Sequence, residues 1–298
     1  MKQAWRAPVA QVVVMVTTAA CSDPTGPGTG AGPIQSPLVF EAIDESGGPF
    51  AIKNGLYTML PDGSGLREHF SVTTNGYSTF SLAWSRDRKR IALVKPTDGS
   101  VHVLDPSTGD AQQVSGPTDF SSRPTLRWHP DNRRLALLHC GGLCGVTTLI
   151  DVETGVAERT ELSYGGLDWN RDGSLITFVL RDPNGVDQVN VMRPDGSGRR
   201  TLTDGGESAF ATRWSPDGAT ILFRTRGSVW TVPVQGDTAR VIAPASGIIP
   251  DFYGTPVAWS PDGRHVAFTR LGQLAIARAD GAEQHIVPTP GWVAWLDW

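Results

Sequence analysis

A tryptophan at the end of a short apolar run recurs six times along the chain, and a polar turn follows five of the copies. The clearest copies read AWSPDG at 258–263 and RWSPDG at 213–218. The six are Trp84, Trp128, Trp169, Trp214, Trp259 and Trp295, which are 44, 41, 45, 45 and 36 residues apart. Such a period is typical of a β-propeller, in which each repeat folds into one four-stranded blade.

A constant spacing within the repeats predicts a hairpin of fixed register. Nine residues after each of the first five tryptophans stands a large apolar residue: Leu93, Leu137, Phe178, Phe223 and Phe268. Pro-Asp-Gly suits the turn between the two strands, because proline presets φ and glycine accepts positive φ. Between frequent turn signals, apolar and polar residues alternate with a period of two, and no helical period occurs. This pattern predicts an all-β protein.

The two ends of the chain complete the repeat. Residues 38–40 and 56–59 resemble second and third strands, and MLPDGSG at 59–65 nearly repeats MRPDGSG at 192–198. The chain therefore begins with strands two to four of a blade and ends with strand one, around Trp295. We expect a six-bladed β-propeller over residues 38–298, closed by pairing the N-terminal strands with the C-terminal strand, which removes exposed sheet edges.

These motifs resemble the TolB-type propeller repeat, the W-S-P-D-G relative of the WD repeat, from about Pro37 to Trp298. The resemblance implies the architecture. It leaves the function open, because propellers support both binding and catalysis.

Residues 1–20 differ from the rest of the chain. Lys2 and Arg6 precede a short apolar run at 12–16, and small residues precede Cys21. This pattern predicts a secretory signal peptide. The small residues before Cys21 resemble a bacterial lipoprotein box, which implies lipidation of Cys21. Simple cleavage after Ala20 is the alternative. Residues 21–37 are rich in Gly, Pro, Ser and Thr and predict a flexible tether. We expect an extracytoplasmic protein of the cell envelope or periplasm, anchored to a membrane by lipid only.

Charge argues against a nucleic-acid partner. The chain has a net charge of −4, and loss of residues 1–20 leaves 24 basic against 30 acidic side chains, or −6. No cluster of lysine and arginine occurs, so nucleic-acid binding is disfavoured. We expect a monomeric propeller.

Two cysteines, Cys140 and Cys144, lie in a glycine-containing segment between strands two and three of one repeat. Export implies an oxidising compartment, so we expect a disulfide between them. Two free thiols are the alternative. Zinc is disfavoured because it usually needs four ligands and only His139 is nearby.

The sequence contains no nucleophile elbow, phosphate-binding loop, His-Glu-x-x-His motif or EF-hand loop. The six histidines are scattered, and turn chemistry accounts for the Asp-Gly pairs. We therefore predict no catalytic residues, no metal and no cofactor, and favour a protein that is not an enzyme.

An aromatic residue precedes most motif tryptophans, in the connection between blades. We expect these connections to emerge on one face of the ring, and aromatic residues with arginine are the usual composition of a binding patch. The candidate partner-binding residues are Tyr77, Phe80, Phe120, Arg123, Tyr164, Phe210, Arg213, Phe252, Tyr253 and Trp292. Alternatively, the rings fold inward and cap the blade interfaces.

The leading functional prediction is a non-catalytic cell-envelope binding or scaffold propeller that presents this face to a protein or glycan. The alternative is an extracytoplasmic lyase or hydrolase with its site at the channel mouth, where Arg123, Arg213 and Asp251 are the first candidates. A purely structural subunit of an envelope complex is a third possibility.

Overall fold

A computed structural model describes residues 36–48, 51–74, 81–95, 97–117, 125–138, 147–160, 165–204, 206–244 and 257–298. These ranges contain strands β1 to β24 and no helix, as the two-residue alternation predicts. Accordingly, no helix in them has the length and hydropathy to cross a bilayer.

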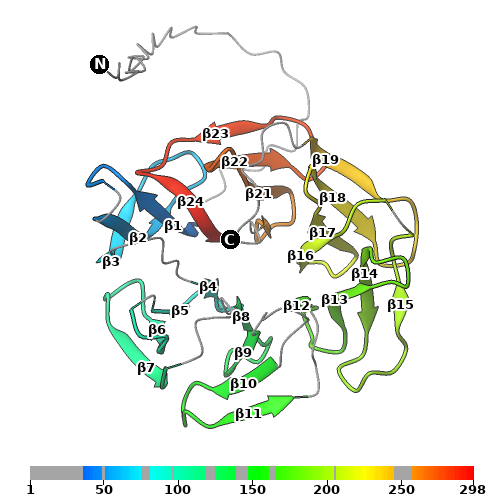
Figure 1. Cartoon of the computed structure of the whole chain (residues 1–298), viewed down its shortest axis with the longest axis horizontal. Helices are drawn as coiled ribbons and strands as arrows, with labels where there is room; N and C mark the ends of the chain where they lie inside the picture. The colour runs from blue at the N-terminus through cyan, green and yellow to red at the C-terminus, as the bar shows by residue number, and fades with distance from the viewer. Residues whose placement is uncertain are drawn as a thin grey trace, which may run out of the picture. The chain divides into compact units, whose positions relative to one another are not determined.

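The strands form six four-stranded antiparallel blades in a ring (Figure 1). The first blade contains β24 (Trp292–Asp297), β1 (Leu38–Asp44), β2 (Ile52–Met59) and β3 (Arg67–Thr74); the second contains β4 (Ser81–Trp84), β5 (Ile91–Val94), β6 (Val101–Leu104) and β7 (Ala111–Ser115). The third contains β8 (Thr125–Trp128), β9 (Arg134–Leu138), β10 (Thr147–Asp151) and β11 (Ala157–Thr160); the fourth contains β12 (Gly165–Trp169), β13 (Ile176–Arg181), β14 (Asp187–Met192) and β15 (Arg200–Thr201). The fifth contains β16 (Phe210–Trp214), β17 (Thr220–Arg224), β18 (Ser228–Pro233) and β19 (Arg240–Pro244); the sixth contains β20 (Val257–Trp259), β21 (His265–Arg270), β22 (Gln273–Arg278) and β23 (His285–Val287).

The core lies between neighbouring blades, and the motif tryptophans are part of it. Trp128 packs with Val94 and Val101 of the second blade, and Trp214 packs with Val189 and Val191 of the fourth. Each of these indoles thus covers the apolar face of the preceding blade. Packing between blades thus explains why a tryptophan recurs at these two positions.

Serine and aspartate hold the turn after the tryptophan. In the fifth blade the Ser215 hydroxyl donates to Asp217 Oδ1 at 2.5 Å, and the Ala219 N–H donates to the same oxygen at 2.9 Å. These hydrogen bonds lower the pKa of Asp217. The equivalent serine hydroxyls in the second and sixth blades donate at 2.6 Å to Asp87 and Asp262, whose pKa values are also lowered although burial opposes the shift.

This pairing predicts a pH-dependent contribution to stability. An aspartate in the unfolded chain titrates near pH ~3.9. Because the folded pKa is lower, the contribution is complete above that pH and is lost as the pH falls through the folded pKa. Replacing Ser85, Ser215 and Ser260 by alanine should lower the free energy of unfolding by about 1–2 kcal/mol each at neutral pH, because each buried hydroxyl also accepts from a backbone N–H. Urea denaturation should show a smaller deficit near pH ~3 than near pH ~7; equal deficits would contradict the prediction.

Pairing between the two chain ends closes the ring. Strand β24 pairs antiparallel with β1, with Val39 opposite Asp297 and Phe40 opposite Leu296. The remaining strands of this blade follow in the order β1, β2, β3. The predicted closure is therefore confirmed.

The sixth motif position is Trp298 and not Trp295. Leu82 pairs with Leu93 in the second blade, and Leu296 pairs in the same way with Phe40, so Trp298 corresponds to Trp84. Packing agrees, because Trp298 clusters with Leu274 and Ile276 of the preceding blade. Trp295 belongs instead to the cluster that contains Trp84 of the following blade.

Trp298 should therefore be a major contributor to closure. It is 6% exposed, and its indole nitrogen donates to the Ser36 carbonyl oxygen at 2.9 Å. We expect Trp298→Ala to lower the free energy of unfolding by about 3–5 kcal/mol, the usual loss for a buried tryptophan. Trp230→Ala is the matched control, because Trp230 is only half-buried, and it should cost less. Chemical denaturation measures both; equal losses would contradict this role.

Candidate functional site

The residue before each motif tryptophan forms one layer around the channel. Each of these residues lies on the inner strand of its blade, which is β4, β8, β12, β16, β20 or β24. Each pairs with a residue of the next strand at the same position of the blade: Ala83 with Ala92, Arg127 with Ala136, Asp168 with Thr177, Arg213 with Leu222, Ala258 with Ala267, and Asp297 with Val39. The inner strands surround the middle of the ring in Figure 1. We call these six residues the channel layer; it contains two arginines, two aspartates and two alanines.

Two bulges precede charged members of the layer. The register shifts between Gly165 and Asp168 in β12, and between Phe210 and Arg213 in β16. Gly166 and Ala211 occupy equivalent bulge positions with φ of 65° and 54°. The Thr212 hydroxyl donates to the Gly166 carbonyl oxygen and ties the two bulges together. Bulges are a common way to redirect a side chain next to a site.

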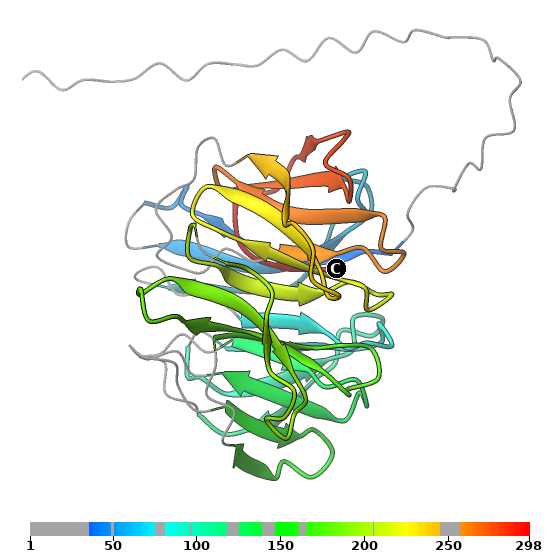
Figure 2. The same cartoon turned by 90° about the vertical axis from the view of Figure 1, so that its right-hand side faces the viewer.

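A cavity of about 330 Å³ opens where the inner strands end. Tryptophans Trp84, Trp128, Trp214, Trp259 and Trp298 form part of its wall, with Arg86, Arg88, Arg127, Arg171, Arg213, Asp168 and Asp297. The lining residues Asp297 and Trp298 are at the C-terminal end of the chain, which Figure 2 marks. We call it the channel-mouth cavity.

Both aspartates of the cavity are engaged by the protein itself. Asp168 Oδ1 accepts from Arg86 Nη2 at 2.9 Å, and Asp168 Oδ2 accepts from the Trp214 N–H at 2.9 Å. Asp297 Oδ2 accepts from the Trp84 N–H at 2.8 Å. The two carboxylates thus tie one blade to the next, and Arg86 reaches across the cavity from the second blade to the fourth.

The arginines are less fully engaged. Arg127 and Arg213 are 7% and 6% exposed, and Nη1 of each donates to the carbonyl oxygen of the preceding residue, Leu126 or Thr212. Within the described ranges neither has a carboxylate oxygen within 4.0 Å. Burial, and after it the charge of Arg213, lower the pKa of Arg127 to about 9, and burial also lowers the pKa of Arg213.

Arg88 lies against a motif tryptophan. Its guanidinium carbon is 4.4 Å from the centre of the Trp84 ring, and its Nη2 donates to the Pro37 carbonyl oxygen. Its Nε and Nη1 are buried and have no hydrogen-bond partner among the described residues. Burial lowers the pKa of Arg88 to about 10, while the charge of Asp297 acts to raise it.

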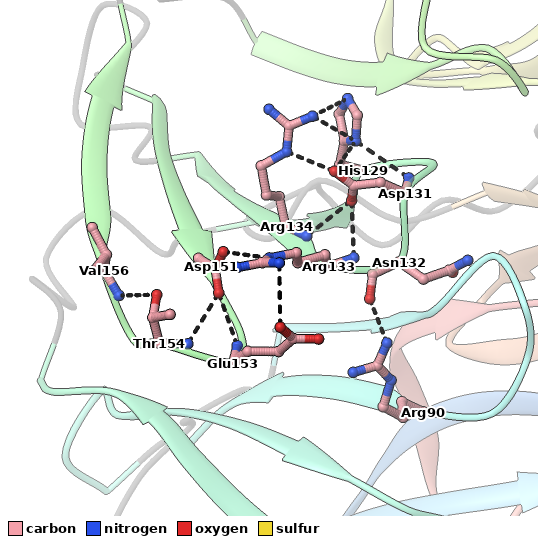
Figure 3. A network of polar contacts seen from close by, with 10 residues as sticks. All are labelled: Arg90, His129, Asp131, Asn132, Arg133, Arg134, Asp151, Glu153, Thr154 and Val156. Atoms are coloured by element: carbon pink, nitrogen blue, oxygen red, sulfur yellow. Dashed lines mark hydrogen bonds and ion pairs between the residues drawn. The ribbon is translucent and has the colours of Figure 1, made fainter.

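A separate polar network joins the second and third blades (Figure 3). Arg90 donates to the Asn132 carbonyl oxygen, and the Asp87 N–H donates to Asn132 Oδ1 at 3.0 Å. In the same turn His129 lies 3.0 Å from Asp131, and its ring meets Trp169 edge-on at 5.3 Å. His129 is thus a packing residue of the interface between the third and fourth blades.

Three of the predicted partner-binding residues fall within the described ranges. Phe210 and Trp292 are half-buried at the beginning of β16 and β24. Arg213 lies near the other end of β16, in the channel-mouth cavity. The remaining predicted site residues lie outside the described residues: Cys21, Tyr77, Phe80, Phe120, Arg123, Cys140, Cys144, Tyr164, Phe252 and Tyr253.

Sequence reasoning missed most of the cavity. Arg127, Asp168 and Asp297 each stand immediately before a motif tryptophan, so aligning the repeats on the tryptophans reveals the charged column. Arg86 and Arg88 lie in a turn, and nothing in the repeat indicates that they face the channel.

The described residues offer no evident metal centre. They contain no group of three or more histidine, cysteine, aspartate or glutamate side chains that could hold an ion. The chemistry that the cavity does offer is hydrogen-bond donation and positive charge beside aromatic rings.

The comparisons with known proteins agree on the fold and leave the function open. No protein-family model matches the chain. The uncharacterized protein YidR of Escherichia coli K12 is 30% identical over 150 residues, which cover 45% of this chain and 35% of that protein. The match therefore spans about a third of the relative's length.

Solved structures identify a TolB-like β-propeller. TolB from Acinetobacter baumannii matches with a TM-score of 0.73 at 19% identity, covering 90% of this chain and 67% of that one. A putative TolB from Agrobacterium tumefaciens matches with a TM-score of 0.57 at 20% identity, covering 77% and 86%. The resemblance found in the repeats is thus confirmed at the level of fold.

The contact between Arg86 and Asp168 should contribute measurably to stability. The side chain of Asp168 is 4% exposed, so solvent screens the pair less than an ordinary surface ion pair. A double-mutant cycle with Arg86→Ala and Asp168→Asn should give a coupling free energy of about 1–2 kcal/mol. The exposed pair Arg181 and Asp187 is the control and should give about 0.5 kcal/mol or less. Equal coupling in the two cycles would contradict this prediction.

Proposed function

We propose that this TolB-like β-propeller is a non-catalytic binding module of the bacterial cell envelope that recruits a protein or glycan partner. The observation that carries the proposal is the channel-mouth cavity. Its walls hold Arg127 and Arg213, which form no salt bridge within the described residues, beside aromatic rings, a combination common in binding sites.

The same cavity argues for binding over turnover. A lyase or hydrolase needs a group that can accept or deliver a proton at the substrate. The two carboxylates that line the cavity already accept hydrogen bonds from backbone N–H groups, at Trp214 and at Trp84. No histidine belongs to the lining described above. These features favour the binding function over the enzymatic alternative.

The location of the protein is part of the proposal. Lys2, Arg6 and the apolar run at 12–16 support export, and the small residues before Cys21 support a lipid anchor. With residues 21–37 as a tether, the propeller would stand away from the membrane surface. The net charge of −6 after removal of the leader favours this anchor over attraction to an anionic lipid surface.

A second contact surface is proposed at the opposite ends of the inner strands. Phe210 and Trp292 begin two of these strands, and the predicted aromatic connections lead into the same ends. A large partner could contact that surface while a ligand group occupies the cavity at the other face.

The test is partner capture in the bacterium that encodes the protein. In-cell crosslinking followed by affinity purification compares the wild type with Arg213→Gln in the cavity, Trp292→Ala at the strand starts, and Cys21→Ala at the anchor. We expect a stoichiometric envelope protein or glycan with the wild type. Arg213→Gln should reduce its yield about tenfold, the usual effect of losing one charged hydrogen bond. Cys21→Ala should release the protein from the membrane fraction.

Melting temperatures of the four proteins provide the control for folding. Arg159→Gln, which removes the same charge from the outer strand β11, away from both proposed contact surfaces, should capture the partner as well as the wild type. Absence of any stoichiometric partner, together with turnover of a polysaccharide or peptide by the purified protein, would overturn the proposal in favour of an enzyme.

A further inference from the structure

The channel-mouth cavity holds more positive charge than its own acids can balance. Five arginines line it against two aspartates, an excess of three positive charges in a chain whose net charge is −4. A concave site with low-dielectric walls concentrates the potential of such charges and attracts ions of opposite sign. The cavity is therefore suited to an anion.

Two of these arginines are buried with no carboxylate in contact, although the charges of Asp168 and Asp297 act on both from a distance. Neither Arg127 nor Arg213 forms a salt bridge within the described part of the chain, although both are more than nine-tenths buried. Nη2 of each, and Nε of Arg127, have no hydrogen-bond partner in that part. An unpaired buried charge is costly, and a bound anion would remove most of that cost.

A purely structural role accounts poorly for this arrangement. A neutral side chain of similar size would fill the same space without the desolvation cost. The chain neutralises Arg86 with Asp168 across the same cavity, so an acidic partner can be placed there. Arg88, Arg127 and Arg213 lack such a partner among the described residues.

The donors that a ligand can reach in the cavity are those of the arginines. The indole N–H groups of Trp84, Trp214 and Trp259 have no acceptor within the described ranges, but these atoms are buried and do not face the cavity. Both lining carboxylates already accept from backbone N–H groups. A ligand with acceptor oxygens matches the unpaired Nη2 groups of Arg127 and Arg213, whereas a cation does not.

We propose that the channel-mouth cavity binds a compact organic polyanion whose charges lie on carboxylate or phosphate groups, held by Arg127, Arg171 and Arg213 beside the motif tryptophans. This inference rests on the proposed binding function and names the chemistry of its ligand. Guanidinium groups bind both kinds of oxyanion through paired hydrogen bonds. A volume of about 330 Å³ lies at the small end of ligand pockets, which suits a sugar acid or a charged end group.

Calorimetric titration of the full mature chain in detergent tests the ligand class. The probes are D-glucarate, D-glucose 6-phosphate and D-glucose, which share a carbon skeleton and differ in charge. We expect both anions to bind at least tenfold more tightly than glucose, and to weaken several-fold as sodium chloride rises from about 50 mM to about 500 mM. Tighter binding of glucarate would identify carboxylate as the charged group of the ligand, and tighter binding of glucose 6-phosphate would identify phosphate.

Two cavity variants and one matched control locate the site. Arg171 is exposed at the cavity, so Arg171→Gln should fold normally and weaken anion binding about tenfold. Arg213→Gln removes a buried charge and should weaken binding by at least as much. Arg226→Gln makes the same charge change at the opposite ends of the fifth-blade strands and should bind like the wild type.

The outcomes separate this inference from the proposed function. Binding of glucose as tight as that of the anions, no detectable anion binding at millimolar concentration, or an equal loss with Arg226→Gln would overturn the polyanion inference. If that happens while Arg213→Gln still loses its partner in cells, the binding function stands with a different ligand. If anions bind as expected but partner capture is unchanged by Arg213→Gln, the ligand class stands and the proposed recruitment role fails.

Discussion

Antiparallel pairing of β24 with β1 is the constraint on which the rest of the structure depends. It joins the two ends of the chain in one blade, so every sheet of the ring has a neighbour on both sides. The same strand places Asp297 and Trp298 at the channel, where Asp297 bonds to the backbone of the second blade. Closure and the wall of the cavity are thus made by the same residues.

The sequence predicts the ring because the spacing within each repeat fixes how the strands of a blade pair. A constant distance from tryptophan to the apolar residue of the next strand means a constant register, and the observed pairing of Leu82 with Leu93 follows from it. The position of the last repeat was harder to predict, because a nearby tryptophan, Trp295, imitates the motif. The pairing of β1 with β24 also changes register between Glu41 and Ala42, and distances along the chain do not reveal this shift.

The site was less predictable than the fold. Channel-layer residues are adjacent to the motif tryptophans, but their identities differ from blade to blade, so the repeat does not predict them. Arg127 and Asp168 line the same cavity only because the blades are arranged around a common axis. Arg86 contacts Asp168 from a turn 82 residues earlier in the chain, and no local pattern predicts a contact of that span.

The channel layer combines what the fold needs with what a ligand meets. Ala83 and Ala258 pack in the core, and Asp168 and Asp297 accept hydrogen bonds from the backbone of the next blade. Arg127 and Arg213 occupy the same layer and form no salt bridge among the described residues. Substitutions at these two positions can therefore change the charge of the channel at a smaller cost to the contacts between blades than substitutions at the other four.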